Sequence, residues 1–420
     1  MRCSRVYFTR TTEYAVSRVQ RGNQPYDLPA TSPRDNGAPE PLRGRCLSEF
    51  ISLFGRCFRL IRLLTKRIRT MFHLLTRYTT ESVTNGHPDK VCDQMSDAIL
   101  DACLAQDPQS RVAVETFGSH GTLMIGGEVT TNANVDYEAI VRKVYADIGY
   151  DDALEVFSRV VTQSGDIAQG VDTGGAGDQG IMYGYATDET PEYLPLGVVL
   201  AHALARKLET LRTSGTLPYL RPDGKTQVTI SDGKVVTALV STQHAEDVEQ
   251  ETIRKDLIEH LFIPVLGGVE NIEILVNPTG RFVMGGFSAD AGLTGRKIMV
   301  DTYGGLMPHG GGAFSGKDAT KVDRSAAYMC RLVAKSLVAS GHAKKALVSV
   351  AYAIGRVEPV MVEAYSEDGT NLSDLVTKNF DFRPFAIRER LGLTRPIFSE
   401  TAAYGHFGVA GRPWEEIVKI

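Results

Sequence analysis

Residues 81–90 read ESVTNGHPDK, and the apolar residues that follow recur with the spacing of a helical face, at Val91, Met95, Ile99 and Ala102. Because a proline fits the first turn of a helix and Asp89 can cap the exposed amides there, a helix is predicted to begin at this string. The start of a helix also attracts anions. His87, Asp89 and Lys90 could therefore supply a proton or hydrogen-bond donor, a Mg²⁺ ligand and a phosphate contact.

The same string has a plainer interpretation, in which Asp89 only caps the helix, Lys90 is solvated and His87 lies in a turn. The local chemistry leaves both interpretations open. Further along the predicted helix, carboxylates recur every fourth residue, at Asp93, Asp97 and Asp101. Such a row can bind a metal ion, but a solvated helix face is the commoner arrangement, and we expect a solvated face here.

From Met71 onward, strand-like and helix-like segments alternate. Strands are predicted at residues 111–117, 122–130, 225–230, 234–241, 272–276, 281–285, 346–354 and 359–365. Helices are predicted at residues 136–149, 196–211, 246–262 and 323–340. The pair Asp232-Gly233 between two of the strands is a strong hairpin signal. Hairpins followed by helices recur, which predicts α+β domains with helices packed on mainly antiparallel sheets.

The composition indicates a globular protein of two or three domains, because 420 residues exceed one ordinary core and 43% are hydrophobic against 23% charged. No apolar run approaches the roughly 18–20 residues of a membrane span, and no good secretory signal is present. The six cysteines form neither metal-ligand pairs nor a dense disulfide pattern. That usage is typical of a reducing compartment, and we expect the cytoplasm.

Charge is divided unevenly along the chain. Residues 1–70 carry 14 Lys and Arg against 5 Asp and Glu, whereas the remaining residues carry 32 against 45. The acidic body argues against a general nucleic-acid role. An acidic protein that handles polyphosphate must also concentrate its few cations and recruit metal ions.

The first 70 residues differ from the rest. Residues 23–41 are rich in Pro, Gly, Asn and Asp and are expected to be disordered, and residues 50–68 have the pattern of a basic amphipathic helix. A targeting or membrane-surface helix is one interpretation. We favour the simpler one, in which an upstream start codon was chosen and Met71 begins the working protein.

Several later loops combine glycine with charged residues. Residues 174–185 read GGAGDQGIMYGY, whose glycines allow close approach to a flat ligand and whose Asp178 offers an anchoring carboxylate. Residues 221–227 read RPDGKTQ, for which a solvated hairpin corner is the default interpretation. Residues 290–297 read DAGLTGRK and precede a predicted apolar strand; the adjacent Arg and Lys suit a polyphosphate, although a solvated basic pair stays open.

Residues 310–325 read GGGAFSGKDATKVDRS and nearly match the P-loop pattern. Asp318 stands where the Mg²⁺-binding hydroxyl should be, so we reject a P-loop. The chemistry still favours phosphate, because Lys317 and Lys321 are followed by Asp323 as a second possible metal ligand. Together the loops predict an enzyme that binds a nucleotide polyphosphate with Mg²⁺, and they do not identify a second substrate.

In their order, these strings resemble the S-adenosylmethionine synthetase family over about residues 72–415. The most distinctive ones are residues 86–90, 175–180, 293–297 and 310–318, and the resemblance ends with YGHFG at residues 404–408. It implies an α+β fold of three similar subdomains around a pseudo-threefold axis, with mixed or antiparallel sheets covered by helices. The implied domains are residues 72–171, 174–285 and 286–415, after a leader of residues 1–70 that has no counterpart in the family.

The resemblance also implies an activity, that of a methionine adenosyltransferase. Methionine sulfur would attack C5′ of ATP and expel triphosphate, which is cleaved to pyrophosphate and phosphate before release. Sulfur is already a neutral nucleophile, so catalysis would rest on alignment and on neutralising the leaving triphosphate. The family usually places its active sites between two subunits, so we expect a homodimer or homotetramer without nucleic-acid or membrane partners.

Individual roles are carried over at matching positions. The implied catalytic residues are His87, Lys225, Arg296, Lys317 and Lys321. ATP binding is implied for these five together with Asp178, Asp223, Asp290, Lys297 and Ala313. Methionine binding is implied for Glu128, Gln169, Asp290 and Lys321. Two Mg²⁺ per site are implied at Asp89 and Asp323, and K⁺ at Glu115.

One departure concerns the segment from Gln169 to Asp178, which is shorter than the family's usual mobile loop and leaves lid-like gating open. Two other classes of protein would also bind a nucleotide. A kinase-like phosphotransferase would pass the γ-phosphate to an acceptor, and a nucleotide sensor would bind ATP without turnover. Formation of a sulfonium product separates both from the synthetase.

Overall fold

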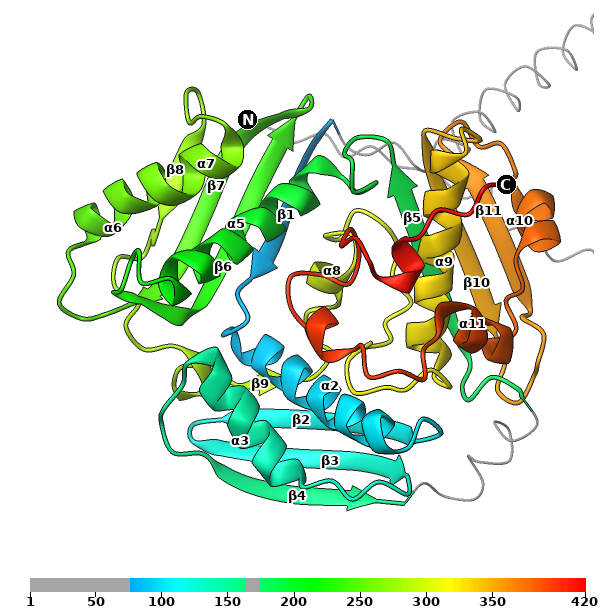
Figure 1. Cartoon of the computed structure of the whole chain (residues 1–420). Helices are drawn as coiled ribbons and strands as arrows, with labels where there is room; N and C mark the ends of the chain where they lie inside the picture. The colour runs from blue at the N-terminus through cyan, green and yellow to red at the C-terminus, as the bar shows by residue number, and fades with distance from the viewer. Residues whose placement is uncertain (1–75, 163–173) are drawn as a thin grey trace, which may run out of the picture. The chain divides into compact units, whose positions relative to one another are not determined.

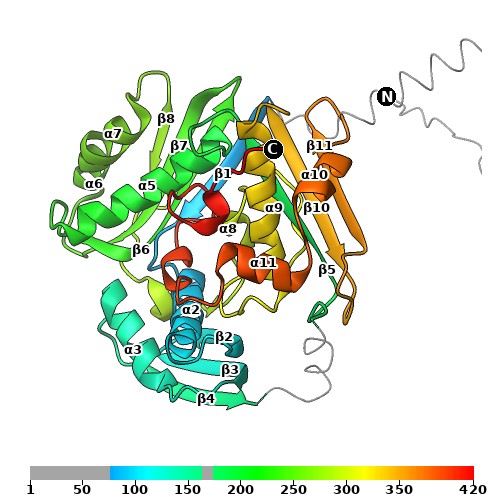
Figure 2. The same cartoon turned by 45° about the vertical axis from the view of Figure 1, so that its right-hand side comes forward.

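The computed structural model describes residues 76–162 and 174–420, so the expectations for the leader, for Gln169 and for residues 163–173 lie outside the described residues (Figure 1). The described chain forms three sheets with helices packed against them. Figures 1 and 2 show the three sheets around the long helices α2, α5 and α9, with the C-terminal segment passing between these helices.

Each sheet joins a hairpin to a strand from a distant part of the sequence. The first sheet has the order β1 (Arg77–Val83), β6 (Leu220–Ser231), β7 (Lys234–His244) and β8 (Glu273–Val276). The second has the order β4 (Glu155–Val161), β3 (Thr122–Thr130), β2 (Arg111–Ser119) and β9 (Gly292–Leu293). The third has the order β11 (Met361–Ser366), β10 (Lys345–Tyr352) and β5 (Gly180–Thr187). The pairs β3–β4 and β7–β8 are parallel and the other pairs are antiparallel.

Helices accompany each sheet. Around the first lie α5 (Leu196–Thr213), α6 (Gln250–Leu257) and α7 (Ile263–Leu266), with a π-helical turn at Ile258–Phe262. Around the second lie α2 (Pro88–Gln106) and α3 (Tyr137–Ile148). Around the third lie α9 (Val322–Ala339), α10 (Ser373–Asn379) and α11 (Pro384–Leu391). Shorter pieces are α8 (Ile298–Asp301) and 3₁₀ turns at Gly286–Ser288, Ser399–Thr401 and Pro413–Glu415.

One continuous apolar core joins the second and third sheets, and a separate core lies under the first. The larger core includes buried residues of α2, such as Met95, and of α9, such as Tyr328. The ring of Trp414 stacks on Tyr328 with centroids 3.8 Å apart, which fixes the C-terminal segment against α9. Helices α2 and α9 both contribute to this core, and both carry residues of the site described below.

Most of the predicted elements are confirmed, with small differences at their ends. The hairpin at Asp232-Gly233 closes β6 and β7 through two residues with positive φ, as an Asp-Gly turn requires. Three predictions were wrong. Residues 281–285 form no strand, the segment after Lys297 is the short helix α8, and the helix predicted at 246–262 begins at Gln250 and passes into the π-helical turn.

Candidate active site

Helix α2 begins within the string ESVTNGHPDK at residues 81–90. The N-cap is His87 rather than Asp89, because the His87 Nδ1 accepts the backbone N–H of Asp89 at 3.2 Å. The carboxylate of Asp89 is thereby available for other contacts. Its Oδ1 accepts from the backbone N–H of Leu293 at 2.9 Å, and its Oδ2 accepts from Lys297 Nζ at 2.5 Å. The prediction that Asp89 caps the helix was wrong, because the imidazole does so.

The imidazole of His87 is neutral at ordinary pH. Burial, together with the positive charges of Lys297 and Lys225, lowers its pKa to about 3. Since Nδ1 accepts a hydrogen bond, the ring proton of the neutral form resides on Nε2. Burial raises the pKa of Asp89, but the hydrogen bonds from Lys297 and Leu293 outweigh it and leave the net pKa below its ordinary value. The site thus offers a neutral donor beside an ionised carboxylate.

Strand β6 adds Asp223 and Lys225 to this corner. The carboxylate of Asp223 is buried, and its Oδ2 accepts from the backbone N–H of Gly286 at 2.9 Å. Its Oδ1 is buried without a hydrogen-bond partner among the described residues, which points to a donor on a bound molecule. Burial, with a smaller contribution from the charge of Asp290, raises the pKa of Asp223 to about 6. The default expectation of a solvated hairpin corner was wrong for Asp223.

We call this group the helix-start cluster. Its members are His87, Asp89, Asp223, Lys225, Asp290, Arg296 and Lys297. The Arg296 Nε lies 3.7 Å from Asp89 Oδ1, and the Arg296 side chain is 54% exposed. Lys297 is mostly buried and paired with Asp89, so these two basic residues are not merely a solvated pair. The cluster therefore combines three cations with one buried imidazole and the two buried carboxylates of Asp89 and Asp223.

A second group, the glycine-loop cluster, comprises Ala313, Lys317, Asp318, Lys321 and Asp323. Lys317 Nζ lies 2.6 Å from Asp323 Oδ2, and Lys321 Nζ lies 2.5 Å from Asp318 Oδ2. The Asp323 carboxylate lies so close to the backbone at Gly312 that a Cβ there would collide with it. This close approach explains why the loop needs glycine at that position.

One loop from each cluster pairs with the same edge of β2. Gly292 and Leu293 pair with Gly118 and Phe117 near one end of the strand. Nearer the other end, Val114 donates its N–H to the carbonyl of Gly316 at 3.0 Å. The backbone of Lys317 forms an isolated antiparallel β-bridge with that of Ala113. Phe117 and Ala113 are separated by roughly 13 Å at the usual strand rise. The two clusters are thus neighbours with a fixed spacing.

The remaining predicted residues are spread more widely. Glu115 on β2 and Glu128 on β3 belong to the face of the second sheet whose side chains are at least partly exposed. Asp178 is exposed in the turn before β5 and accepts the N–H of Gln179. A Cβ on Gly180 would lie 3.6 Å from Asp323 Oδ1, so this turn leads to the glycine-loop cluster.

Two expectations about α2 were wrong. Lys90 is fully buried and pairs with Asp93 at 2.9 Å and with Asp301, so it is neither solvated nor a phosphate contact. The row of aspartates is not a solvated face, because Asp93 and Asp97 are completely buried. The 3.6-residue spacing shows which residues share a helix face and cannot show whether that face is covered.

Sequence reasoning also missed functional neighbours. Tyr150 donates its hydroxyl to the carbonyl of Gly86 at 2.6 Å, and Gln243 accepts the N–H of Asp223 at 3.3 Å. Both brace the helix-start cluster from segments that carry no motif. Asp318, in the string at residues 310–325, was given no role in the site. Its spacing of three residues from Lys321 is the sequence feature that could have indicated one.

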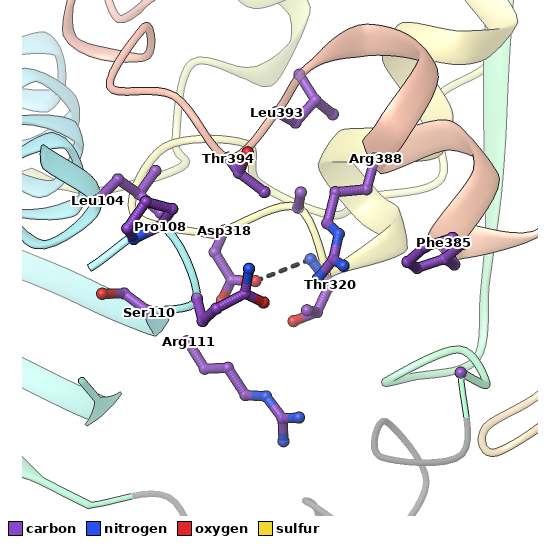
Figure 3. A pocket seen from close by; sticks show the side chains of 13 residues that line it. Leu104, Pro108, Ser110, Arg111, Asp318, Thr320, Phe385, Arg388, Leu393 and Thr394 are labelled. Atoms are coloured by element: carbon purple, nitrogen blue, oxygen red, sulfur yellow. Dashed lines mark hydrogen bonds between the residues drawn. The ribbon is translucent and has the colours of Figure 1, made fainter. Parts of the chain in front are cut away.

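A cavity of about 300 Å³ lies beside Asp318 (Figure 3). Arg111, Thr320 and Arg388 are among its lining residues, and Figure 3 shows the hydrogen bond between Asp318 and Thr320 at its edge. Among the described residues, none of those predicted to bind a substrate lines this cavity. Of the two clusters only Asp318 lines it, and that carboxylate is paired with Lys321, so we place the chemistry at the clusters and not in this cavity.

Three family models match the chain in order. They are S-adenosylmethionine synthetase, N-terminal domain, at residues 76–166, the central domain at residues 173–282 and the C-terminal domain at residues 284–416. The chain belongs to the S-adenosylmethionine synthetase family. Its three α+β parts, with mixed sheets covered by helices, have the fold of that family, and its activity is that of a methionine adenosyltransferase.

Similar proteins named S-adenosylmethionine synthase support this membership. The synthase of Clostridium tetani is 51% identical over 380 residues, which cover 82% of this chain and 97% of the relative. That of Pseudothermotoga lettingae is 53% identical over 369 residues, covering 79% and 93%. That of Thermus thermophilus is 50% identical over 379 residues, covering 81% and 96%. Within the described residues of this synthetase, no helix has the length and apolarity of a membrane span.

Proposed function

We propose that this synthetase joins the sulfur of methionine to C5′ of ATP and expels the whole triphosphate, which it hydrolyses to pyrophosphate and phosphate before release. The observation that carries this proposal is the buried imidazole of His87, whose Nδ1 accepts the N–H of Asp89 and whose pKa is lowered by burial and by the charges of Lys297 and Lys225. Its Nε2–H is a donor suited to the oxygen that leaves C5′. A charged imidazole would be repelled by these lysines. A neutral imidazole is not, and its Nε2–H can still donate a hydrogen bond to the substrate.

Catalysis then rests on stabilising the leaving group. The triphosphate gains charge on its bridging oxygen in the transition state, and donors fixed in advance stabilise that charge without reorganising. Lys225, Arg296 and Lys297 supply cations from the helix-start cluster. Lys317 and Lys321 supply cations from the glycine-loop cluster, and Ala313 lets the backbone approach the nucleotide. Methionine sulfur is uncharged and nucleophilic, so alignment replaces a general base.

The two clusters also fit metal ions that share the phosphates. Members of this family use metal ions, and we propose two Mg²⁺ per site at Asp89 and Asp323, with K⁺ at Glu115. Mg²⁺ is usually held by one or two carboxylates together with substrate phosphates. In the described parts of the chain, no three His, Cys, Asp or Glu side chains converge on one point, which favours such shared coordination over an all-protein cage. The ions would neutralise triphosphate charge when bound.

For methionine, we propose a pocket that takes groups from both clusters and from β3. Lys321 would pair with the substrate carboxylate, and Glu128 and Asp290 would receive its ammonium group. Gln169 would complete this pocket. The orphaned Oδ1 of Asp223 would accept a hydrogen bond from adenosine, with Asp178 on the opposite side.

We propose a homodimer, or a dimer of such dimers, as the active unit. Phe117, Met124 and Phe157 are opposite each other on β2, β3 and β4, and they are 47%, 45% and 47% exposed. A row of large apolar side chains at the surface favours a protein partner. Glu115 and Glu128 lie on the same face, so a second subunit there would close the site. Each active site would combine the helix-start cluster of one subunit with the glycine-loop cluster of the other.

The remaining assignments are proposals as well. We place the enzyme in the cytoplasm, which suits the free, buried thiols of Cys92, Cys103 and Cys330. We divide the body into domains at residues 72–171, 174–285 and 286–415, and we regard residues 1–70 as dispensable for activity.

The test is an assay of the purified protein with ATP, Mg²⁺, K⁺ and labelled methionine. We expect a labelled sulfonium product together with one phosphate and one pyrophosphate per turnover. Transfer of only the γ-phosphate would support a kinase-like enzyme. Binding of ATP without any product would support a nucleotide sensor.

A further inference from the structure

Helix α2 carries a ladder of four carboxylates, one on each successive turn, and each one holds a backbone N–H of a distant segment. Asp89 accepts from Leu293 at 2.9 Å, Asp93 from Gly295 at 2.8 Å, and Asp97 from Gly316 at 2.8 Å. Asp101 accepts from Phe398 at 3.0 Å and from Ser399 at 2.7 Å. One rigid helix thus fixes several loops at once.

The two middle contacts fall beside the cations of the proposed site. Gly295 directly precedes Arg296 and Lys297, and Gly316 directly precedes Lys317. Asp93 and Asp97 are completely buried, so they position the loops from beneath. Each hydrogen bond fixes the backbone N–H of the glycine directly before a basic residue. It thereby restricts the position of that basic residue's Cα, from which the side chain extends.

Asp97 also works through Arg324 of α9. The guanidinium of Arg324 forms two bonds to Asp97, at 2.6 and 2.9 Å, and its NH1 donates to the carbonyls of Phe314 at 2.9 Å and Lys317 at 3.3 Å. The turn that carries Lys317 is therefore held through one amide and two carbonyls. This pair uses charge-assisted bonds, which are stronger than neutral ones.

We propose that Asp93 and Asp97 are positioning residues for adenosyl transfer: Asp93 positions the Arg296-Lys297 pair, and Asp97 positions Lys317. This proposal rests on the proposed function of those cations. Because each loop is attached to the rigid helix α2, a change in either carboxylate displaces the cations of its own loop from the other groups of the site in which they act. A misplacement of about 1 Å in a preorganised site can cost on the order of 10²-fold in rate.

The ladder contains its own matched control. Asp101 lies on the same helix and makes the same kind of contact, but its partners Phe398 and Ser399 belong to a segment without proposed site residues. Asp101→Asn should therefore lower the melting temperature while the single-turnover rate stays within about twofold of wild type. Asp93→Asn and Asp97→Asn should lower that rate about tenfold or more, with a much smaller change in KM for ATP.

Charge balance decides which variants fold. Asp93→Asn leaves Lys90 paired with Asp301, so no buried charge loses its only partner. Asp97→Asn leaves Arg324 buried without a carboxylate. The double variant Asp97→Leu with Arg324→Met removes both charges together, which folded proteins tolerate far better. It should fold and still lose rate about tenfold or more.

Hydrogen exchange measured on each intact variant supplies a second readout that needs no turnover. Asp93→Asn should speed amide exchange in residues 292–297 and leave residues 312–318 unchanged. The Asp97 variants should speed exchange in residues 312–318 and leave residues 292–297 unchanged. Wild-type rates in folded Asp93→Asn and in the double variant, or equal exchange in both loops, would overturn the proposal. If wild type makes no sulfonium product, the proposed function fails, and the exchange pattern still reports on the ladder.

Discussion

The chemistry of single residues is most clearly tested at His87 and Lys317. If both stabilise the leaving triphosphate, replacing either by alanine should lower kcat on the order of 10²–10³-fold and change KM for ATP far less. His87→Asn keeps a donor and should be milder than His87→Ala. Lys317→Ala should also slow hydrolysis of added tripolyphosphate. Single-turnover measurements with melting temperatures in parallel check this, and near-normal chemistry in both alanine variants would show that these residues are misassigned.

A second residue prediction concerns stability and pH. His202 is buried, its Nδ1 lies 2.8 Å from Ser82 Oγ, and burial with the charges of Arg206 and Lys90 lowers its pKa to about 3. The unfolded chain takes up this proton below pH 6.5, whereas the folded chain resists until about pH 3. His202 should therefore cost about 1.4 kcal/mol of stability per pH unit below 6.5.

The measurement is urea unfolding of wild type and His202→Gln between pH 7 and pH 5. Stability of wild type should fall more steeply with decreasing pH than that of the variant. His342→Gln, at an exposed position 3.2 Å from the carbonyl of Ile420, serves as the control and should keep a slope closer to that of wild type. Equal slopes in wild type and His202→Gln would contradict the assignment.

Residue types revealed much of the site but not its burial. The strings around His87, Asp223, Arg296 and Lys317 could be predicted because each combines glycine with charge in a short segment. The buried role of Asp97 could not, since its partners Gly316 and Arg324 are more than 200 residues away. Only tertiary packing decides whether a carboxylate meets water or a guanidinium.

At the scale of elements, local signals worked where pairing is local. The hairpin of β6 and β7, with Asp232-Gly233 at its turn, follows from turn chemistry and alternation. The strands β1, β5 and β9 pair only with strands far away in the sequence, and none of them was predicted. A two-residue strand such as Gly292–Leu293 has no periodicity that a sequence could display.

The C-terminal segment gives an element-scale prediction. Glu415 is buried, with Arg331 at 2.9 and 3.0 Å and Lys335 at 2.8 Å. Glu415→Gln leaves Arg331 and Lys335 without the negative charge that they pair with. It should lower the free energy of unfolding by about 3–5 kcal/mol. The partly buried pair Glu189 and Lys345 is the control, and Glu189→Gln should cost about 1 kcal/mol or less. Urea unfolding measures both, and equal losses would contradict the argument.

At the scale of the whole molecule, the leader offers a simple experiment. Residues 1–70 have the opposite charge balance to the body, and the family models begin at residue 76. A chain that starts at Met71 should fold and keep full activity in the sulfonium assay. A truncated protein that is folded but inactive would show that the leader contributes to function.

The order of the strings predicted the family, and the fold class followed from it. The exchange of strands between the three sheets was not visible in the sequence, because strand pairing at long range leaves no local pattern. The surface proposed for the dimer was not visible in the sequence either. Its apolar row of Phe117, Met124 and Phe157 becomes apparent only when three strands are aligned.

Complementation between two inactive subunits tests the shared active site most directly. Lys225→Ala disables the helix-start cluster, and Lys317→Ala disables the glycine-loop cluster. In a mixed dimer one site has both defects, and the other has an intact cluster from each subunit. Co-expressed variants that assort at random should therefore recover about one quarter of wild-type activity. Activity that stays at the level of the two separate variants would show that each site lies within one subunit.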